Sequence, residues 1–163
     1  MIKILVINTV RFKLNGISAV IKNYYRAMDK ENIKMDFLAI DDPSEEYQAF
    51  FEENNLNCFV QYKKNIVDYF KGIIKLCRQE KYDIVHIHGN SANMAIELLA
   101  VTFGGVKVKI THSHNTATMH PCMHKMLWPL FAKLCTVRLA CGEDAGKWLY
   151  REQKFTVLNN GIE

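Results

Sequence analysis

Short aliphatic runs alternate with segments of helical hydrophobic period along the chain, and this alternation constrains the fold more than any other feature. The first run, residues 2–8, consists almost entirely of Ile, Leu and Val, which is typical of a strand buried in a parallel sheet. The next segment repeats apolar side chains at helical spacing from Ile17 to Met28. By the same criteria, strands are predicted at residues 2–8, 33–40, 57–62, 82–88, 106–112, 137–141 and 155–158.

The segments between these strands have the length and period of helices. A regular strand–helix alternation favours right-handed crossovers that bring the strands into one parallel sheet. The sequence therefore predicts an α/β fold, a Rossmann-like doubly wound and mostly parallel sheet of about seven strands with helices on both faces. The helices are predicted at residues 17–28, 45–54, 66–77, 91–103, 119–135 with a kink at Pro129, and 143–151.

Composition narrows the class of protein. With 163 residues, 49% hydrophobic and 23% charged, the chain fits a single globular domain over residues 1–163. A net charge of +4 is too mild to indicate a nucleic-acid partner. No run approaches the roughly 20 apolar residues of a membrane span, and the first strand is too short for a signal peptide. The five scattered cysteines form no CxxC motif, so we expect a reducing, cytoplasmic location.

Two His-x-His pairs close two of the predicted strands. They are His86 with His88, and His112 with His114. Residues i and i+2 of a strand point to the same face, so both rings of a pair lie on one side. The carboxyl ends of parallel strands meet at one edge of the sheet, where α/β proteins bind ligands. Four of the six histidines are therefore predicted to line one crevice.

Three interpretations of these histidines remain open at this stage. One ring of each pair packs between sheet and helix, or the rings bind a metal, or they line a crevice for a sugar or phosphate. A metal-dependent hydrolase is the enzyme alternative, although the carboxylates that usually complete such a site are scarce nearby. In a sugar crevice, side chains with hydrogen-bonding groups bind the ligand hydroxyls. Those side chains are His88, Asn90, His114, Asn115 and Thr116.

The loop after the first strand ends in Asn15-Gly16, just before a predicted helix. A glycine there lets backbone N–H groups approach an anion at the helix N-terminus. The loop is neither GxGxxG nor a P-loop, so an ordinary turn glycine is the competing interpretation. A non-catalytic Rossmann-like module that binds an anion is accordingly the non-enzyme alternative. Lys63 and Lys64 are predicted to be solvated.

Five segments, taken in order, resemble the N-terminal domain of GT-B glycosyltransferases of the retaining family 4 type. Together they extend over essentially the whole chain, and the last, with its Asn-Gly-Ile-Glu ending, is the most specific. The His-Ser-His-Asn form is most similar to bacterial capsular and exopolysaccharide transferases. The segments are Ile4–Gly16, Tyr82–His88 (YDIVHIHG with the next glycine), Ile110–Thr116 (ITHSHNT), Arg138–Leu149 (RLACGEDAGKWL) and the closing FTVLNNGIE.

The resemblance implies a particular division of labour. A C-terminal domain binds the nucleotide-sugar donor, usually a UDP-sugar, while the N-terminal domain supplies most of the acceptor site. Asn15 and Gly16 map onto the loop that approaches the donor phosphates. His114 maps onto the histidine beside the reacting sugar and the acceptor hydroxyl, and is the expected catalytic residue. The reaction retains anomeric configuration and uses neither a cofactor nor a metal.

The resemblance also implies what this chain lacks. Many members have Gly-Gly where this loop has Asn15-Gly16, and the Glu-x7-Glu motif of the donor domain is absent. We therefore expect residues 1–163 to be the acceptor-side domain, inactive alone, with its own C-terminal domain as partner. The expected acceptor is a saccharide or lipid-linked saccharide held by His88, Asn90, Asn115 and Thr116. Residues 119–134 are apolar and basic, which fits either a core helix or contact with the inner membrane face.

Overall fold

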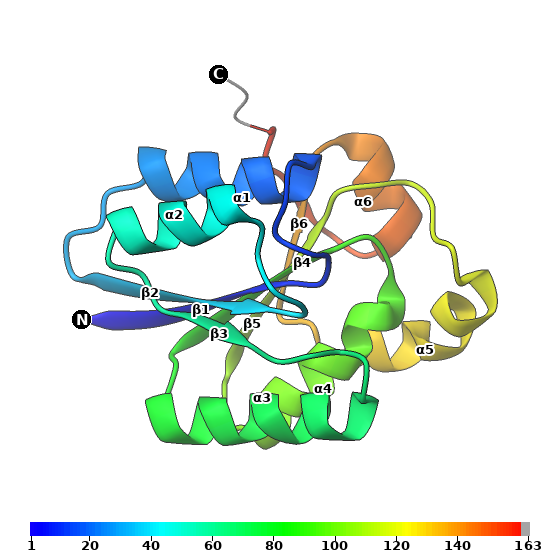
Figure 1. Cartoon of the computed structure of the whole chain (residues 1–163). Helices are drawn as coiled ribbons and strands as arrows, with labels where there is room; N and C mark the ends of the chain where they lie inside the picture. The colour runs from blue at the N-terminus through cyan, green and yellow to red at the C-terminus, as the bar shows by residue number, and fades with distance from the viewer. Residues whose placement is uncertain (161–163) are drawn as a thin grey trace.

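The computed structural model describes residues 1–160 and shows an α/β protein with one central sheet (Figure 1). Gly161, Ile162 and Glu163, which end the FTVLNNGIE motif, lie outside the described residues. The elements are β1 (Ile2–Asn8), α1 (Gly16–Ala27), β2 (Ile33–Ala39), α2 (Glu45–Glu53), β3 (Cys58–Val60), α3 (Ile66–Glu80), β4 (Ile84–Gly89), the 3₁₀ turn η1 (Ala92–Met94), α4 (Ala95–Phe103), β5 (Val108–Ser113), α5 (Pro121–Leu134), β6 (Val137–Ala140), α6 (Glu143–Tyr150) and β7 (Thr156–Val157).

The sheet has the strand order β3-β2-β1-β4-β5-β6-β7, and each neighbouring pair is parallel. The predicted doubly wound sheet of seven strands is thus confirmed. The chain builds outward from β1 to β3, then returns to the other side of β1 with β4, so the winding direction reverses between β1 and β4. In open α/β sheets this reversal point is where ligands bind, just beyond the carboxyl ends of the strands.

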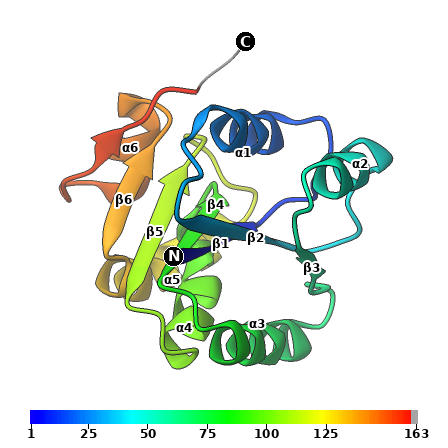
Figure 2. The ribbon, with the colours of Figure 1, turned by 90° about the vertical axis from the view of Figure 1, so that its left-hand side faces the viewer.

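Helices cover both faces of the sheet. Helices α1 and α2 lie over one face, and α3, α4 and α5 lie over the other (Figure 1). Seen from the side, β4 and β5 run through the middle of the molecule, with α1 above them and α4 below (Figure 2). An aromatic cluster packs α2 against the sheet through edge-on and tilted ring contacts. Its members are Phe12, Phe37, Tyr47, Phe50 and Phe51.

Local sequence signals mark where α1 and α5 begin. The Asn15 side chain caps α1 by accepting a hydrogen bond from the Ser18 N–H at 2.9 Å. Helix α5 begins at Pro121 and continues past Pro129 to Leu134, so the helix is not interrupted at that proline. Phe131 is its one fully buried side chain, whereas the neighbouring apolar residues of α5 are half-buried or exposed.

Among the described residues, no helix is both long and apolar enough to span a bilayer.

Candidate functional site

A crevice of about 690 Å³ opens at the point where the winding reverses. Loops that follow β1, β3, β4 and β5 form its walls, so the crevice lies at the carboxyl edge of the sheet, as the sequence predicts. Its polar side chains come from all four loops, and its apolar wall comes from η1, α4 and the start of α5. The walls include Thr9, Lys63, Asn90, Asn93, Asn115 and Met119.

Gly89 allows the floor of this crevice to be tight. A Cβ atom at Gly89 would lie 2.6 Å from the Thr9 Oγ1 atom and 2.9 Å from the Met94 sulfur. The Thr9 hydroxyl and N–H both donate to the His88 carbonyl, at 2.8 and 3.1 Å, which continues the β1–β4 pairing past the end of the strands. The absence of a side chain at residue 89 therefore brings the loops after β1 and β4 together.

Two amide oxygens in the crevice have no partner among the described residues. The Oδ1 atoms of Asn90 and Asn93 are buried and make no hydrogen bond there. Buried polar atoms nearly always make a hydrogen bond, so two amide oxygens without one in a pocket wall are suited to binding a polar ligand. Sugar hydroxyls are donors of the required kind.

Lys63 is held in the crevice by an ion pair that the sequence did not reveal. Its ammonium lies 2.6 Å from the Oε1 atom of Glu97, a residue of α4 that is fully buried. The Tyr69 hydroxyl donates to the same oxygen at 2.9 Å. The prediction that Lys63 is solvated is therefore wrong. The signal was present in α4, where a single acid stands in the run Ala-Ile-Glu-Leu-Leu-Ala-Val.

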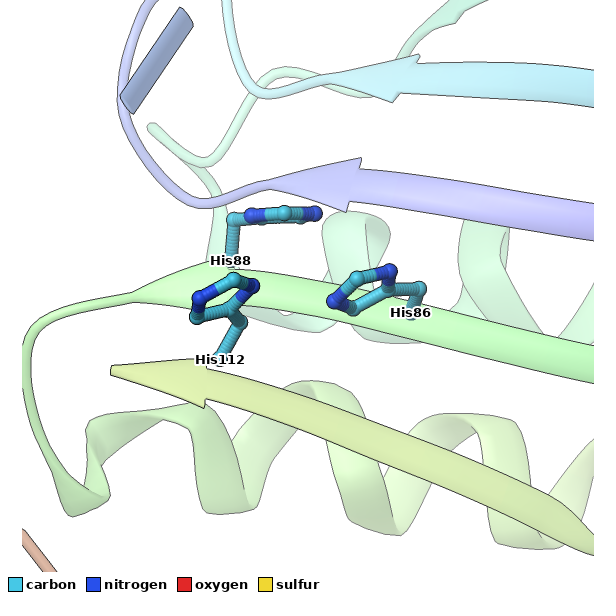
Figure 3. Close-up of side chains that lie close together, drawn as sticks. All are labelled: His86, His88 and His112. Carbon is cyan, nitrogen blue, oxygen red and sulfur yellow. The ribbon is translucent and has the colours of Figure 1, made fainter. Parts of the chain in front are cut away.

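The two histidine pairs do meet, as the strand pattern predicts. His112 lies opposite His88 in the β4–β5 register, and the rings of His86, His88 and His112 lie close together (Figure 3). The His114 ring stacks beside those of His88 and His112, with 5.2 and 4.3 Å between ring centroids. The Nδ1 atom of His88 and the Nε2 atom of His114 are 2.9 Å apart, so one ring donates a hydrogen bond to the other. The Tyr24 ring of α1 stacks over His112, with 6.3 Å between ring centroids.

Burial keeps these rings neutral. Loss of hydration lowers the pKa of His86 to about 3, of His112 to about 2 and of His114 to about 4. The pKa of His88 is also driven well below the ordinary value, first by burial and then by the neighbouring imidazoles. At neutral pH the cluster therefore consists of imidazoles, each able to donate from one nitrogen and accept at the other.

The remaining candidate residues lie at different places around the crevice. Asn90 and Asn115 are in its walls, whereas His88 instead lines a separate apolar cavity of about 370 Å³ under α1. His114 is half-buried and directly precedes Asn115. Thr116 is exposed and lies outside the crevice walls, and its N–H donates to the Asn115 side chain at 2.7 Å.

Asn15 and Gly16 open α1 next to this edge. Asn15 is committed to capping, and its amide also donates to the Arg11 carbonyl at 3.0 Å. Gly16 is exposed, and a Cβ built there meets nothing within 4 Å. The first turn of α1 has no acidic side chain, so the positive end of the helix dipole is not neutralised there.

Comparison with solved structures gives the same fold. The chain superposes on MurG of Acinetobacter baumannii with a TM-score of 0.68 at 10% identity, covering 100% of this chain and 47% of MurG. It superposes on Anabaena Alr3699/HepE, solved in complex with UDP, with a TM-score of 0.66 at 11% identity, covering 99% of this chain and 45% of that one. At such identities the likeness establishes the Rossmann-like fold, which is also found in these proteins.

Sequence comparison identifies the family. EpsF of Bacillus subtilis (strain 168), described as a putative glycosyltransferase, is 27% identical over an alignment that covers 91% of this chain and 42% of EpsF. The chain thus spans less than half the length of the relatives it matches. The family described as Glycosyltransferase Family 4 matches residues 14–163, which include both histidine pairs and the crevice residues other than Thr9 and Val10. The chain belongs to Glycosyltransferase Family 4 and has the Rossmann-like fold of an N-terminal GT-B domain.

Proposed function

We propose that this chain is the acceptor-side half of a glycosyltransferase that moves a sugar from a UDP-sugar to a saccharide or lipid-linked acceptor. The observation that carries the proposal is the crevice at the winding reversal, with unpaired amide oxygens on Asn90 and Asn93, in a chain of Family 4. We assign the product to surface polysaccharide synthesis, and the location to the cytoplasm at the inner face of the membrane. The similarity to EpsF, which is described as a putative glycosyltransferase, supports the reaction class.

The crevice has two kinds of wall, which fit two parts of one acceptor. Asn90 and Asn93 present unpaired carbonyl oxygens that accept hydrogen bonds from sugar hydroxyls. On the other side, Met119 and Met123 supply flexible apolar surface. Met119 is 91% exposed, so this wall continues onto the outer surface at the start of α5. A saccharide carried on a lipid would place its polar and apolar portions against these two walls.

The donor side is assigned to the first turn of α1. Asn15 orders that turn by capping it, and Gly16 leaves the backbone open to an approaching diphosphate. The Lys63 ammonium also lies in the crevice wall, where it is paired with the Glu97 carboxylate. In this proposal a second domain binds the nucleotide, so these residues contact the donor only when the two domains face each other, and the fragment alone does not transfer sugar.

His114 is proposed as the histidine at the reaction centre. Its Nε2 atom faces His88, which leaves Nδ1 for the reacting groups. The lowered pKa keeps the ring neutral, so it can donate to or accept from a sugar hydroxyl without adding a charge. Its role in the proposal is to orient the donor sugar and the acceptor hydroxyl, with retention of anomeric configuration and with no metal in the transfer step.

Acceptor kinetics of the two-domain protein test this assignment. Asn90→Ala removes an amide that the proposal places on the acceptor, so the acceptor KM should rise about tenfold while the donor KM stays the same. Asn54→Ala, at the far end of α2, is the matched control and should change neither constant. An unchanged acceptor KM for Asn90→Ala in a folded protein would exclude the crevice as the acceptor site.

A further inference from the structure

Three imidazole rings lie close together between α1 and the face of the sheet that α1 covers. His86 and His88 are two residues apart on β4, so their side chains point to the same face of the sheet. His112 lies opposite His88 on β5, and its side chain points to that face as well. One ring nitrogen of each lies within 4.8 Å of those of the other two. Figure 3 shows the three rings close together, and the ring planes of His86 and His112 are parallel to within 1°, with 5.6 Å between their centroids. We propose that this trio binds one Zn²⁺ ion or another transition-metal ion of similar preference.

Three ring nitrogens of this trio have no partner among the described residues. The Nε2 atom of His86 and both ring nitrogens of His112 are buried, and none makes a hydrogen bond among the described residues. His112 is 0% exposed. An imidazole has one donor and one acceptor to satisfy, so three orphaned nitrogens on two neighbouring rings need an explanation. A coordinated ion takes one lone pair from each ring, which accounts for the Nε2 atom of His86 and for one of the two His112 nitrogens.

The chemical state of the rings is the one that metals require. Burial lowers the pKa of both His86 and His112 far below neutrality, so a proton does not compete with the ion at pH 7. An all-imidazole donor set favours Zn²⁺, Cu²⁺ or Ni²⁺ over Mg²⁺ or Ca²⁺, which prefer oxygen ligands. Three histidines with water in the fourth position are an established zinc geometry.

The geometry needs only a small contraction. Zinc–nitrogen bonds of about 2.0–2.1 Å in a tetrahedron place the nitrogens about 3.3 Å apart, so nitrogens that lie within 4.8 Å of one another must approach by up to about 1.5 Å. His88 enters with Nε2, because its Nδ1 is 2.9 Å from the Nε2 atom of His114. His114 then acts as the outer hydrogen-bonding partner that orients a ligating ring. The adjoining apolar cavity, lined in part by His86 and His88, has room for a water ligand.

This inference goes beyond the proposed function and does not depend on it. The trio lies on the sheet face that α1 covers, whereas the crevice that contains Asn90 and Asn115 opens at the strand ends. An ion here would link β4 and β5 through their histidines. With the Nε2 atom of His88 on the ion, its Nδ1 would carry the proton and donate the hydrogen bond to His114. Its role is therefore structural, and its detection requires no sugar transfer.

Metal titration of the 163-residue chain tests the site directly. After removal of metal with EDTA, competition with a chromophoric chelator should show one Zn²⁺ per chain at pH 7.5. Co²⁺ in the same site should give the intense visible bands of tetrahedral coordination without a thiolate charge-transfer band. Zinc at 100 times its dissociation constant should raise Tm by about 5–10 °C. A thiolate band, or no binding above the level of the His112→Gln variant, would overturn the assignment.

Matched variants separate this trio from surface binding. His86→Gln and His112→Gln should each weaken zinc binding by more than tenfold, and His114→Asn by about 10–100-fold through its outer position. His120→Asn removes an exposed histidine and should leave the affinity unchanged. A loss of binding in His120→Asn instead would assign the zinc to the surface. If His112→Gln does not fold, the cobalt spectrum of the wild-type chain still decides between nitrogen and thiolate ligands.

Discussion

Acidification should destabilise this protein steeply, because the folded state buries imidazoles in the neutral form. In the unfolded chain a histidine titrates near pH 6.5, whereas in the folded chain the pKa of His112 is about 2 and that of His88 lies well below its ordinary value. Between those limits the unfolded state binds more protons than the folded state. Stability is therefore complete above about pH 6.5 and decreases as the pH falls toward the folded pKa values.

The size of the effect follows from two fully buried rings. Each costs about 1.4 kcal/mol for every pH unit below 6.5, so a fall from pH 6.5 to 5.0 removes about 2 kcal/mol per ring and about 4 kcal/mol for His88 and His112 together. His86 and His114, whose pKa values are lowered to about 3 and about 4, act in the same direction. A domain of this size has a free energy of unfolding of about 5–15 kcal/mol, so a loss of about 4 kcal/mol removes a large fraction of its stability.

Urea unfolding at pH 7.5, 6.5 and 5.0, in EDTA and followed by tryptophan fluorescence, measures the effect. The His112→Gln variant should lose about 2 kcal/mol of the pH dependence, whatever the substitution costs at pH 7.5. His120→Asn, at an exposed position, should retain the full dependence. Equal pH dependence in wild type and His112→Gln, within about 0.5 kcal/mol, would refute the claim that burial holds this ring neutral.

Three further substitutions test local parts of the account by urea unfolding at pH 7.5. Lys63→Ala leaves the Glu97 carboxylate buried without its cation and should cost about 2–3 kcal/mol, whereas Lys64→Ala should change stability by less than about 0.5 kcal/mol. Asn15→Ala removes the cap of α1 and should cost about 1 kcal/mol, and Asn15→Ser should restore most of it. Gly89→Ala places a methyl group against two side chains and should cost about 1–3 kcal/mol, and wild-type stability for this variant would contradict the tight crevice floor.

Much of the fold was predictable because its strands are long aliphatic runs in a strict alternation with helices. All seven strands and six helices were placed by pattern, and parallel pairing follows from that alternation. The edge strands are shorter than predicted: β3 is Cys58–Val60 rather than 57–62, and β7 is Thr156–Val157 rather than 155–158. The hydrophobic pattern indicates which residues are buried. The length of an edge strand depends instead on how many of its residues pair with its single neighbouring strand.

The candidate site was predictable only in part. That the four histidines share a face follows from their spacing, but the cavity that a ring reaches depends on where α1 lies over the sheet, and Tyr24 over His112 is a contact between distant segments. The Lys63–Glu97 ion pair joins residues 34 positions apart. The ring contact has no local sequence signal, and the single acid in the apolar run of α4 marks Glu97 without naming its partner, because each contact depends on how two separately formed elements pack.

Sugar transfer by the two-domain protein with His114 replaced tests the central claim most directly. The claim is that the carboxyl edge of this Family 4 domain, with His114 at its centre, orients the reacting groups. His114→Ala should fold, bind the nucleotide donor with unchanged affinity, and lower kcat/KM for the acceptor by about 100-fold, the cost of losing one positioned hydrogen-bonding group at a reaction centre. Unchanged kcat/KM in a folded His114→Ala protein would contradict the account.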